Sequence, residues 1–146
     1  HQQLLKTAGV TTLFLAGFHS IIGFFPSVSR FFGAPEPLLQ NYAALVVTSL
    51  FISGLLVLAG VYALSGGGFI RRLPALRPVL FIISLIFLLR GMMILPQILV
   101  LAGWIDTTVP VTVRFLFFSA GALGLGLVFS LGTAGGWQAL KAGLDS

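Results

Sequence analysis

The stretch PVLFIISLIFLLRGMMILPQILVLAG, residues 78–103, decides the fold because it is apolar along almost its whole length. Its one charged residue is Arg90. A helix needs about 20 predominantly apolar residues to cross the hydrocarbon core of a bilayer. The stretch exceeds that length, so it predicts a membrane-spanning helix.

Three further stretches meet the same criterion, at about residues 7–25, 42–64 and 111–131. Segments rich in proline and glycine separate the four stretches, as is typical of turns. Four such stretches joined by short loops in a chain of 146 residues are improbable as buried helices of a soluble protein. We therefore expect an all-α polytopic membrane protein, a single four-transmembrane-helix bundle that occupies residues 1–146.

The composition agrees with this fold class. Hydrophobic residues make up 58% of the chain and charged residues 8%, whereas a soluble domain carries about 25% charged residues. The chain has no cysteine, which excludes disulfides, thiolate catalysis and cysteine-ligated metals. Its net charge is +5, but the cations are spread thinly along the chain and do not predict a nucleic-acid partner.

The distribution of the cations predicts the orientation. An even number of spans places both termini on one side of the membrane, together with the loop between the second and third spans. The cations on that side are Lys6, Arg71, Arg72, Arg77 and Lys141, against Arg30 and Arg114 on the other. By the positive-inside rule both termini are cytoplasmic, and we expect the membrane to be a bacterial inner membrane.

Small residues four apart allow helices to approach closely within lipid. The spans contain such pairs, among them Ala16 with Ser20, Ser49 with Ser53, Ala120 with Gly124, and Ala122 with Gly126. They favour a compact bundle, and they would equally serve contact with a partner subunit.

Two basic side chains lie at the same expected depth inside the membrane. Arg90 follows Arg77 by 13 residues, and His19 follows Lys6 by 13 residues. At 1.5 Å per residue this is about 20 Å along each helix. Because the first and third spans run in the same direction, we expect the two residues to share one level.

An arginine at this depth costs roughly 3 kcal/mol on insertion scales, so it should face the bundle interior and find acceptors. None of the four spans contains aspartate or glutamate. Arg90 shares a helix face with Gln97. Pro96 lacks the N–H that would bond to the carbonyl of Met92, which leaves that carbonyl as a further acceptor.

These residues form one candidate ligand-binding site. Its members are Arg90, His19, Gln97, Ser53 and Glu36, with Ser119 as a weaker candidate. In one interpretation Arg90 and His19 bind an anionic or carbonyl group of a lipid, fatty acid, quinone or isoprenoid. In the other, Arg90 only holds the helices together. Glu36 could take part only if residues 26–40 fold back into the mouth of the bundle rather than lie flat at the interface.

The chain shows no constellation typical of catalysis or metal binding, so we expect neither catalytic nor metal-binding residues, and no particular cofactor is indicated. We expect a non-catalytic accessory subunit of a larger membrane complex, which could hold a lipid near Arg90 and His19. The alternative is a stand-alone binder or transporter of a small lipophilic or anionic amphiphilic molecule. The expected partners are the lipid membrane and other membrane subunits or a second copy of the chain, not nucleic acid.

Overall fold

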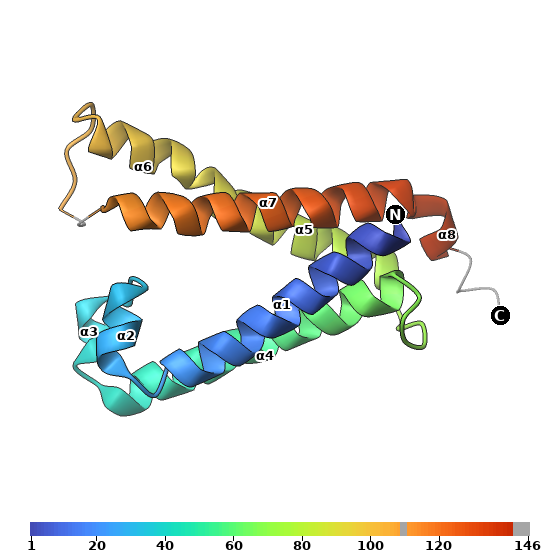
Figure 1. The fold of residues 1–146 in the computed structure, drawn as a ribbon, viewed down its shortest axis with the longest axis horizontal. Coiled ribbons are helices and arrows are strands. Elements are labelled where there is room, and N and C mark those ends of the chain that lie inside the picture. Colours follow the sequence, from blue (N-terminus) through green and yellow to red (C-terminus); the bar gives the residue numbers. More distant parts are fainter. Residues whose placement is uncertain (109–110, 142–146) are drawn as a thin grey trace.

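The computed structural model describes residues 1–108 and 111–141. Over these residues the chain is helical, and four helical spans are long and apolar enough to cross a membrane. They form two antiparallel hairpins (Figure 1). The first hairpin pairs α1 (Gln2–Ile22) with α4 (Tyr42–Gly66). The second pairs α5 (Leu76–Met92) and α6 (Ile94–Leu101) with α7 (Val113–Gly135).

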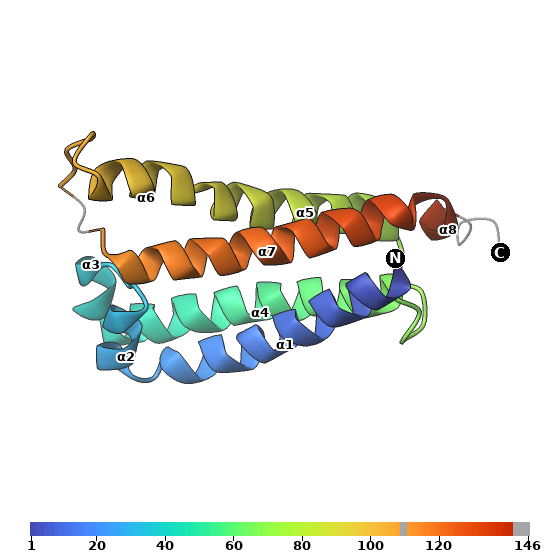
Figure 2. The same cartoon turned by 45° about the horizontal axis from the view of Figure 1, so that its top comes forward.

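Three short helices complete the fold. Two of them, α2 (Pro26–Phe31) and α3 (Glu36–Leu39), connect α1 to α4, and α8 (Trp137–Lys141) follows α7. The N-terminus, the α4–α5 loop and α8 lie together at one end of the molecule (Figure 1). We call this the basic end, because Lys6, Arg71, Arg72, Arg77 and Lys141 lie on the elements that meet there. The opposite end carries α2, α3, the end of α6 and the start of α7 (Figure 2).

Small residues allow the helices of the first hairpin to approach closely. A Cβ atom added to Gly60 would lie 3.1 Å from the carbonyl oxygen of Gly9, and one added to Gly23 would overlap Ser49. The Ser53 hydroxyl donates to the carbonyl oxygen of Ala16 at 2.8 Å. It also lies 2.6 Å from the Ser20 hydroxyl. Ser20 and Ser53, two of the small residues that the sequence identified, therefore also hydrogen-bond across the hairpin.

The second hairpin uses glycine in the same way. A Cβ atom on Gly91 would overlap the backbone of Leu123, and one on Gly126 would lie 2.8 Å from the backbone nitrogen of Leu88. The Ala122–Gly126 pair thus includes a helix contact, as expected. Gly124 of the other pair does not, because open space surrounds the position of its added Cβ.

The third span differs from the prediction of one continuous helix over residues 78–103. It begins at Leu76, ends at Leu101 and is interrupted at Met93, between α5 and α6. Pro96 explains the interruption, since a proline has no N–H for the carbonyl four residues earlier. The next helical bond, from the Gln97 nitrogen to the Met93 oxygen, is long at 3.3 Å.

The other spans keep their expected positions with shifted ends. The first begins at Gln2 and ends at Ile22, before Pro26. The second extends to Gly66, and the fourth runs from Val113 to Gly135. Proline and glycine at the boundaries explain where the apolar runs stop, but not the shifts of two to five residues at the helix ends.

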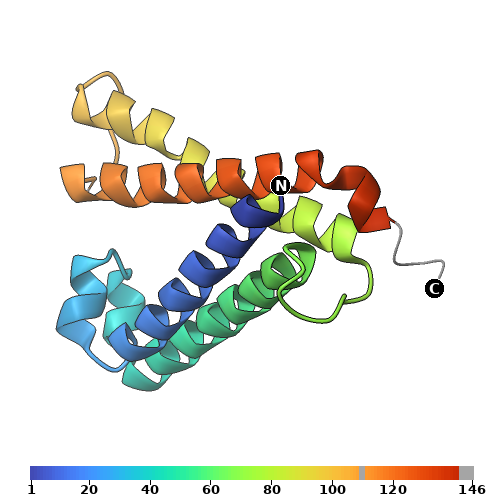
Figure 3. The same cartoon turned by 45° about the vertical axis from the view of Figure 1, so that its right-hand side comes forward.

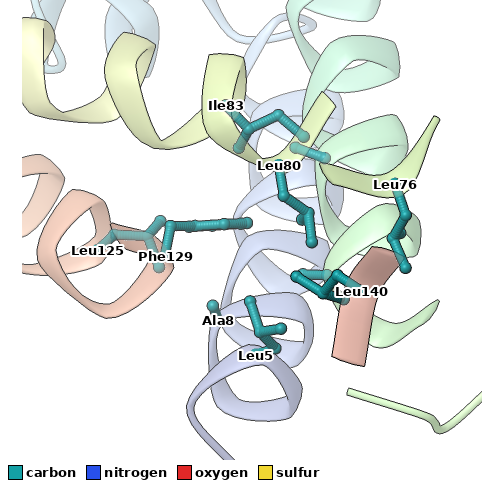
Figure 4. Close-up of a cluster of buried hydrophobic side chains, with 10 residues drawn as sticks. Leu5, Ala8, Leu76, Leu80, Ile83, Leu125, Phe129 and Leu140 are labelled. Carbon is teal, nitrogen blue, oxygen red and sulfur yellow. The ribbon is translucent and has the colours of Figure 1, made fainter. Parts of the chain in front are cut away.

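The hydrophobic core lies near the basic end, where the two hairpins meet (Figure 4). Its largest fully buried members include Phe129 of α7, Leu80 of α5 and Leu5 of α1. The rings of Phe87 and Phe129 stack at 5.4 Å. Away from this core the two hairpins diverge, so that the molecule has the outline of a V (Figures 1 and 3).

The segment α2–α3 lies at the open end of the V. The Ser29 hydroxyl donates to the carbonyl oxygen of Ile22 at 2.7 Å, which holds α2 against the end of α1. Phe32, directly after α2, contacts Phe18 of α1 and Phe118 of α7, with ring centroids 5.1 and 5.2 Å away. The segment therefore connects the two hairpins where their long helices diverge.

Candidate functional site

Arg90 continues a stripe of core residues on α5. Leu80, Ile83, Phe87 and Arg90 follow each other at helical spacing and share one face. Leu80 and Ile83 are buried in the core, and Phe87 packs against it. Arg90 is exposed. The face of α5 that begins in the core therefore continues into the divergent part of the V, where Arg90 lies.

The Arg90 guanidinium has a defined partner on α7. Its Nη1 donates to the Ser119 hydroxyl at 3.1 Å. The Ser119 hydroxyl donates in turn to the Gln97 side-chain oxygen of α6 at 2.8 Å. Ser119 is completely buried, so its hydroxyl is a fixed link between the other two side chains. We call Arg90, Ser119 and Gln97 the arginine cluster.

Two local features of the chain bring the cluster together. Gly91 lets the α7 backbone approach α5 directly beside Arg90, and this places Ser119 within reach. The break at Met93 then reorients α6, which carries Gln97 onto the same hydroxyl. A continuous helix with a larger residue at position 91 would not form this arrangement.

His19 occupies the corresponding stripe of α1. Leu5 and Ala8 lie in the core and Thr12 is fully buried, while His19 continues their face toward the open end. The imidazole is half-buried. No hydrogen bond or ion pair joins it to any other residue within 1–108 and 111–141. His19 therefore faces the same divergent region as Arg90 without contacting the arginine cluster.

The structure places the two remaining candidates elsewhere. Ser53 bonds to α1 within the first hairpin. Glu36 forms an exposed ion pair with Arg30 at 3.3 Å, so it does not reach down to Arg90. Of the five candidate residues, Arg90 and Gln97 are brought together, and Ser119 joins them.

The sequence analysis missed an aromatic group at the open end. The Arg114 guanidinium lies over the rings of Phe31 and Phe115, 4.8 and 5.4 Å from their centroids. Gly33, with φ +96°, brings the chain against Phe115. The paired phenylalanines at 31–32 and 117–118 were the available signal, because aromatic rings favour contacts with one another.

Comparison with known proteins finds no matching family model, no similar curated protein and no similar solved structure.

The arginine cluster is suited to binding. A guanidinium presents five N–H donors in a fixed plane, and one bond to Ser119 leaves several of them free for a ligand. The free donors match a carboxylate, a phosphate or a carbonyl group. Over the residues that the structure describes, no three histidine, aspartate or glutamate side chains gather as metal ligands would.

Proposed function

We propose that this protein binds, within the membrane, an amphiphile with an anionic or carbonyl head group, between its two hairpins and with Arg90 as the anchor. The observation that carries the proposal is the exposed guanidinium on a face of α5 that is otherwise part of the core. The proposed role is non-catalytic.

The energetics support a ligand. Arg90 follows the first residue of α5 by 14 residues, which is about 21 Å along the helix axis. A charge at such a depth costs roughly 3 kcal/mol on insertion scales. The hydrogen bond to the neutral Ser119 hydroxyl offsets part of this insertion cost. A charge-assisted bond to an anion contributes about 1.5–3 kcal/mol. An anionic head group is therefore the favoured acceptor for the remaining donors.

The surroundings support an amphiphile rather than a free anion. Phe87 lies one turn before Arg90 on α5, and the exposed Met93 lies one turn after it, between α5 and α6. His19 faces the divergent part of the V from α1. Ligand sites of this kind are mostly apolar with a few polar groups that fix orientation. An acyl or isoprenoid chain would fill the apolar part and the head group would reach Arg90.

The proposal includes the orientation in the membrane. We infer that the basic end faces the cytoplasm, because five cations lie on its elements and cytoplasmic loops carry the excess of lysine and arginine. Both termini would then be cytoplasmic and the V would open toward the outer leaflet. We place the protein in a bacterial inner membrane.

The second candidate is an accessory subunit of a larger membrane complex. It is supported by Gly121 and Gly124 of α7, where an added Cβ would meet open space. Ala120 beside them is exposed as well. Small, open faces of this kind allow a helix of another chain to approach closely.

Native mass spectrometry of the protein released from membranes in mild detergent tests both candidates. We expect a retained lipophilic adduct that Arg90→Gln loses and that Arg72→Gln keeps. The second variant removes the same charge from an exposed loop. A wild-type protein without an adduct would contradict the binding proposal, as would equal loss in both variants. Co-purification of a second membrane chain that Gly121→Leu abolishes would support the subunit role instead.

A further inference from the structure

A cavity of about 480 Å³ lies on the second hairpin near the basic end, away from the arginine cluster. Phe81, Leu85 and Leu88 of α5 form one wall. Ser130 and Thr133 of α7 and Trp137 of α8 form the other. Phe81 and Leu85 remain 56% and 45% exposed, so the cavity is open to the surrounding lipid.

Thr133 leaves a hydrogen-bonding group unsatisfied in this cavity. The residue is 3% exposed, and its hydroxyl has no hydrogen-bond partner among the residues that the structure describes. The Ser84 and Ser130 hydroxyls in the same walls donate to their own helices, to the carbonyl oxygens of Leu80 and Gly126. A buried hydroxyl without a partner is costly, which indicates that a bound molecule supplies the acceptor.

Arg77 lies beside the cavity at the basic end, in contact with Trp137 of its wall. Its guanidinium lies over the Trp137 ring, 4.2 Å from the centroid. Its Nε is buried and has no hydrogen-bond partner within the described part of the chain. Arg77 precedes Phe81 by one helical turn and lies on the same face of α5. A cation with a free donor is thus held at the rim of an apolar cavity.

The order of these groups along the helices matches the order of groups in a phospholipid. Trp137 and Arg77 lie at the basic end, and Thr133 lies in the last turn of α7, before the chain breaks at Gly136 and continues into α8. The apolar wall of Phe81, Leu85 and Leu88 continues in the same direction. Phosphate, ester carbonyl and acyl chain follow one another in this sequence in a membrane lipid.

We propose that the cavity binds one anionic phospholipid of the surrounding membrane. Its phosphate accepts from Arg77, its ester carbonyl accepts from the Thr133 hydroxyl, and one acyl chain fills the apolar cavity. The preference for an anionic head group follows from the guanidinium of Arg77 on Trp137 and from Lys141 of α8 at the same end. Basic pockets at the interfacial ends of transmembrane helices bind anionic head groups in this way.

Lipid titration followed by native mass spectrometry tests the proposal. The probes are phosphatidylglycerol and phosphatidylcholine with identical acyl chains. All titrations are done in the Arg90→Gln background, so that a lipid held by the arginine cluster is not counted. We expect phosphatidylglycerol to bind more tightly than phosphatidylcholine. Arg77→Gln should weaken phosphatidylglycerol about tenfold, and Arg72→Gln should leave it within about twofold.

Two further variants test the position of the lipid. Thr133→Val keeps the shape and removes the donor, so it should weaken both lipids by a similar factor. Ala134→Phe fills the cavity from an exposed position of its wall and should abolish the tight binding of both. Equal affinity for the two lipids in the wild-type cavity would overturn the proposal. Undiminished binding in Ala134→Phe, or equal loss in Arg72→Gln and Arg77→Gln, would overturn it as well.

Discussion

The ring of Phe32 lies 5.2 Å from the ring of Phe118, and this contact links the first hairpin to the second at the end where their long helices diverge. The same ring contacts Phe18 of α1 at 5.1 Å. One side chain in the α2–α3 segment therefore connects α1 and α7.

Replacing Phe32 by alanine should widen the open end. Each aromatic pair contributes about 0.5–1.5 kcal/mol beyond its buried area, and the variant loses its contacts with Phe18, Phe31 and Phe118. Pulsed electron paramagnetic resonance between spin labels at Ile21→Cys and Phe117→Cys should then give a longer mean distance or a broader distance distribution. Phe14→Ala, at a ring that is 74% exposed, is the control. An unchanged distance in Phe32→Ala would show that the link is not needed.

Removing the Ser119 hydroxyl should destabilise the second hairpin. Ser119→Ala leaves the Gln97 oxygen without its donor and Arg90 without its acceptor. An unsatisfied buried partner costs about 1–3 kcal/mol, so the thermal unfolding midpoint in detergent should fall. Ser130→Ala, which loses only a bond to its own helix, should change it little. Equal midpoints for the two variants would argue against the cluster as a structural link.

Ser53→Ala should weaken the first hairpin by a smaller amount. The hydroxyl bonds across the hairpin to Ala16 and Ser20, and hydrogen bonds between transmembrane helices average about 0.6 kcal/mol with a maximum near 1.7. A double-mutant cycle with Ser20→Ala measures the coupling between the two hydroxyls. We expect the double variant to lose less stability than the two single variants together. Ser84→Ala, at a hydroxyl bonded within its own helix, serves as the reference. Strict additivity in the cycle would contradict the interhelical bond.

Gly91→Ala should be destabilising and Gly121→Ala should not. The added methyl at Gly91 overlaps the α7 backbone at Leu123, whereas the one at Gly121 meets open space. Overpacking costs about 1–3 kcal/mol, and an open helix position gains up to about 1 kcal/mol from the better propensity of alanine. Unfolding midpoints of the two variants should therefore move in opposite directions. A neutral Gly91→Ala would mean that the hairpin can separate without cost.

The orientation can be tested with single cysteines, since the chain has none of its own. Phe69, in the α4–α5 loop, and Trp104, after α6, are 68% and 79% exposed. In spheroplasts, a membrane-impermeant maleimide should label Trp104→Cys at once and Phe69→Cys only after lysis. The reverse pattern would place the basic end outside.

The sequence predicted the four spans because their apolar length is a local property that each stretch carries by itself. It also predicted from their spacing that Arg90 and Gln97 lie on one side of the span, but it did not predict the break at Met93 through which Gln97 reaches Ser119. It did not predict that Ser53 would bond to α1 instead of joining them. Helical spacing gives the face of a residue but not the helix that it meets.

The divergence of the hairpins could not be predicted for a related reason. It depends on where close contacts occur between helices, as at Gly91 with Leu123 and Gly9 with Gly60. The small-residue pattern allows several such contacts, and Gly124 satisfies it without making one. Phe32 was not identified because its contacts join three segments that lie far apart in the chain.

The confinement of the core to one end has a consequence for how a molecule would reach Arg90. In the proposed orientation the V opens within one leaflet, so a molecule would enter it sideways from the lipid, without any passage through water. The rate of entry would then depend on the mole fraction of that molecule in a single leaflet, a concentration in two dimensions. Exchange would also slow when the fatty chains around the protein become ordered, as they do on cooling.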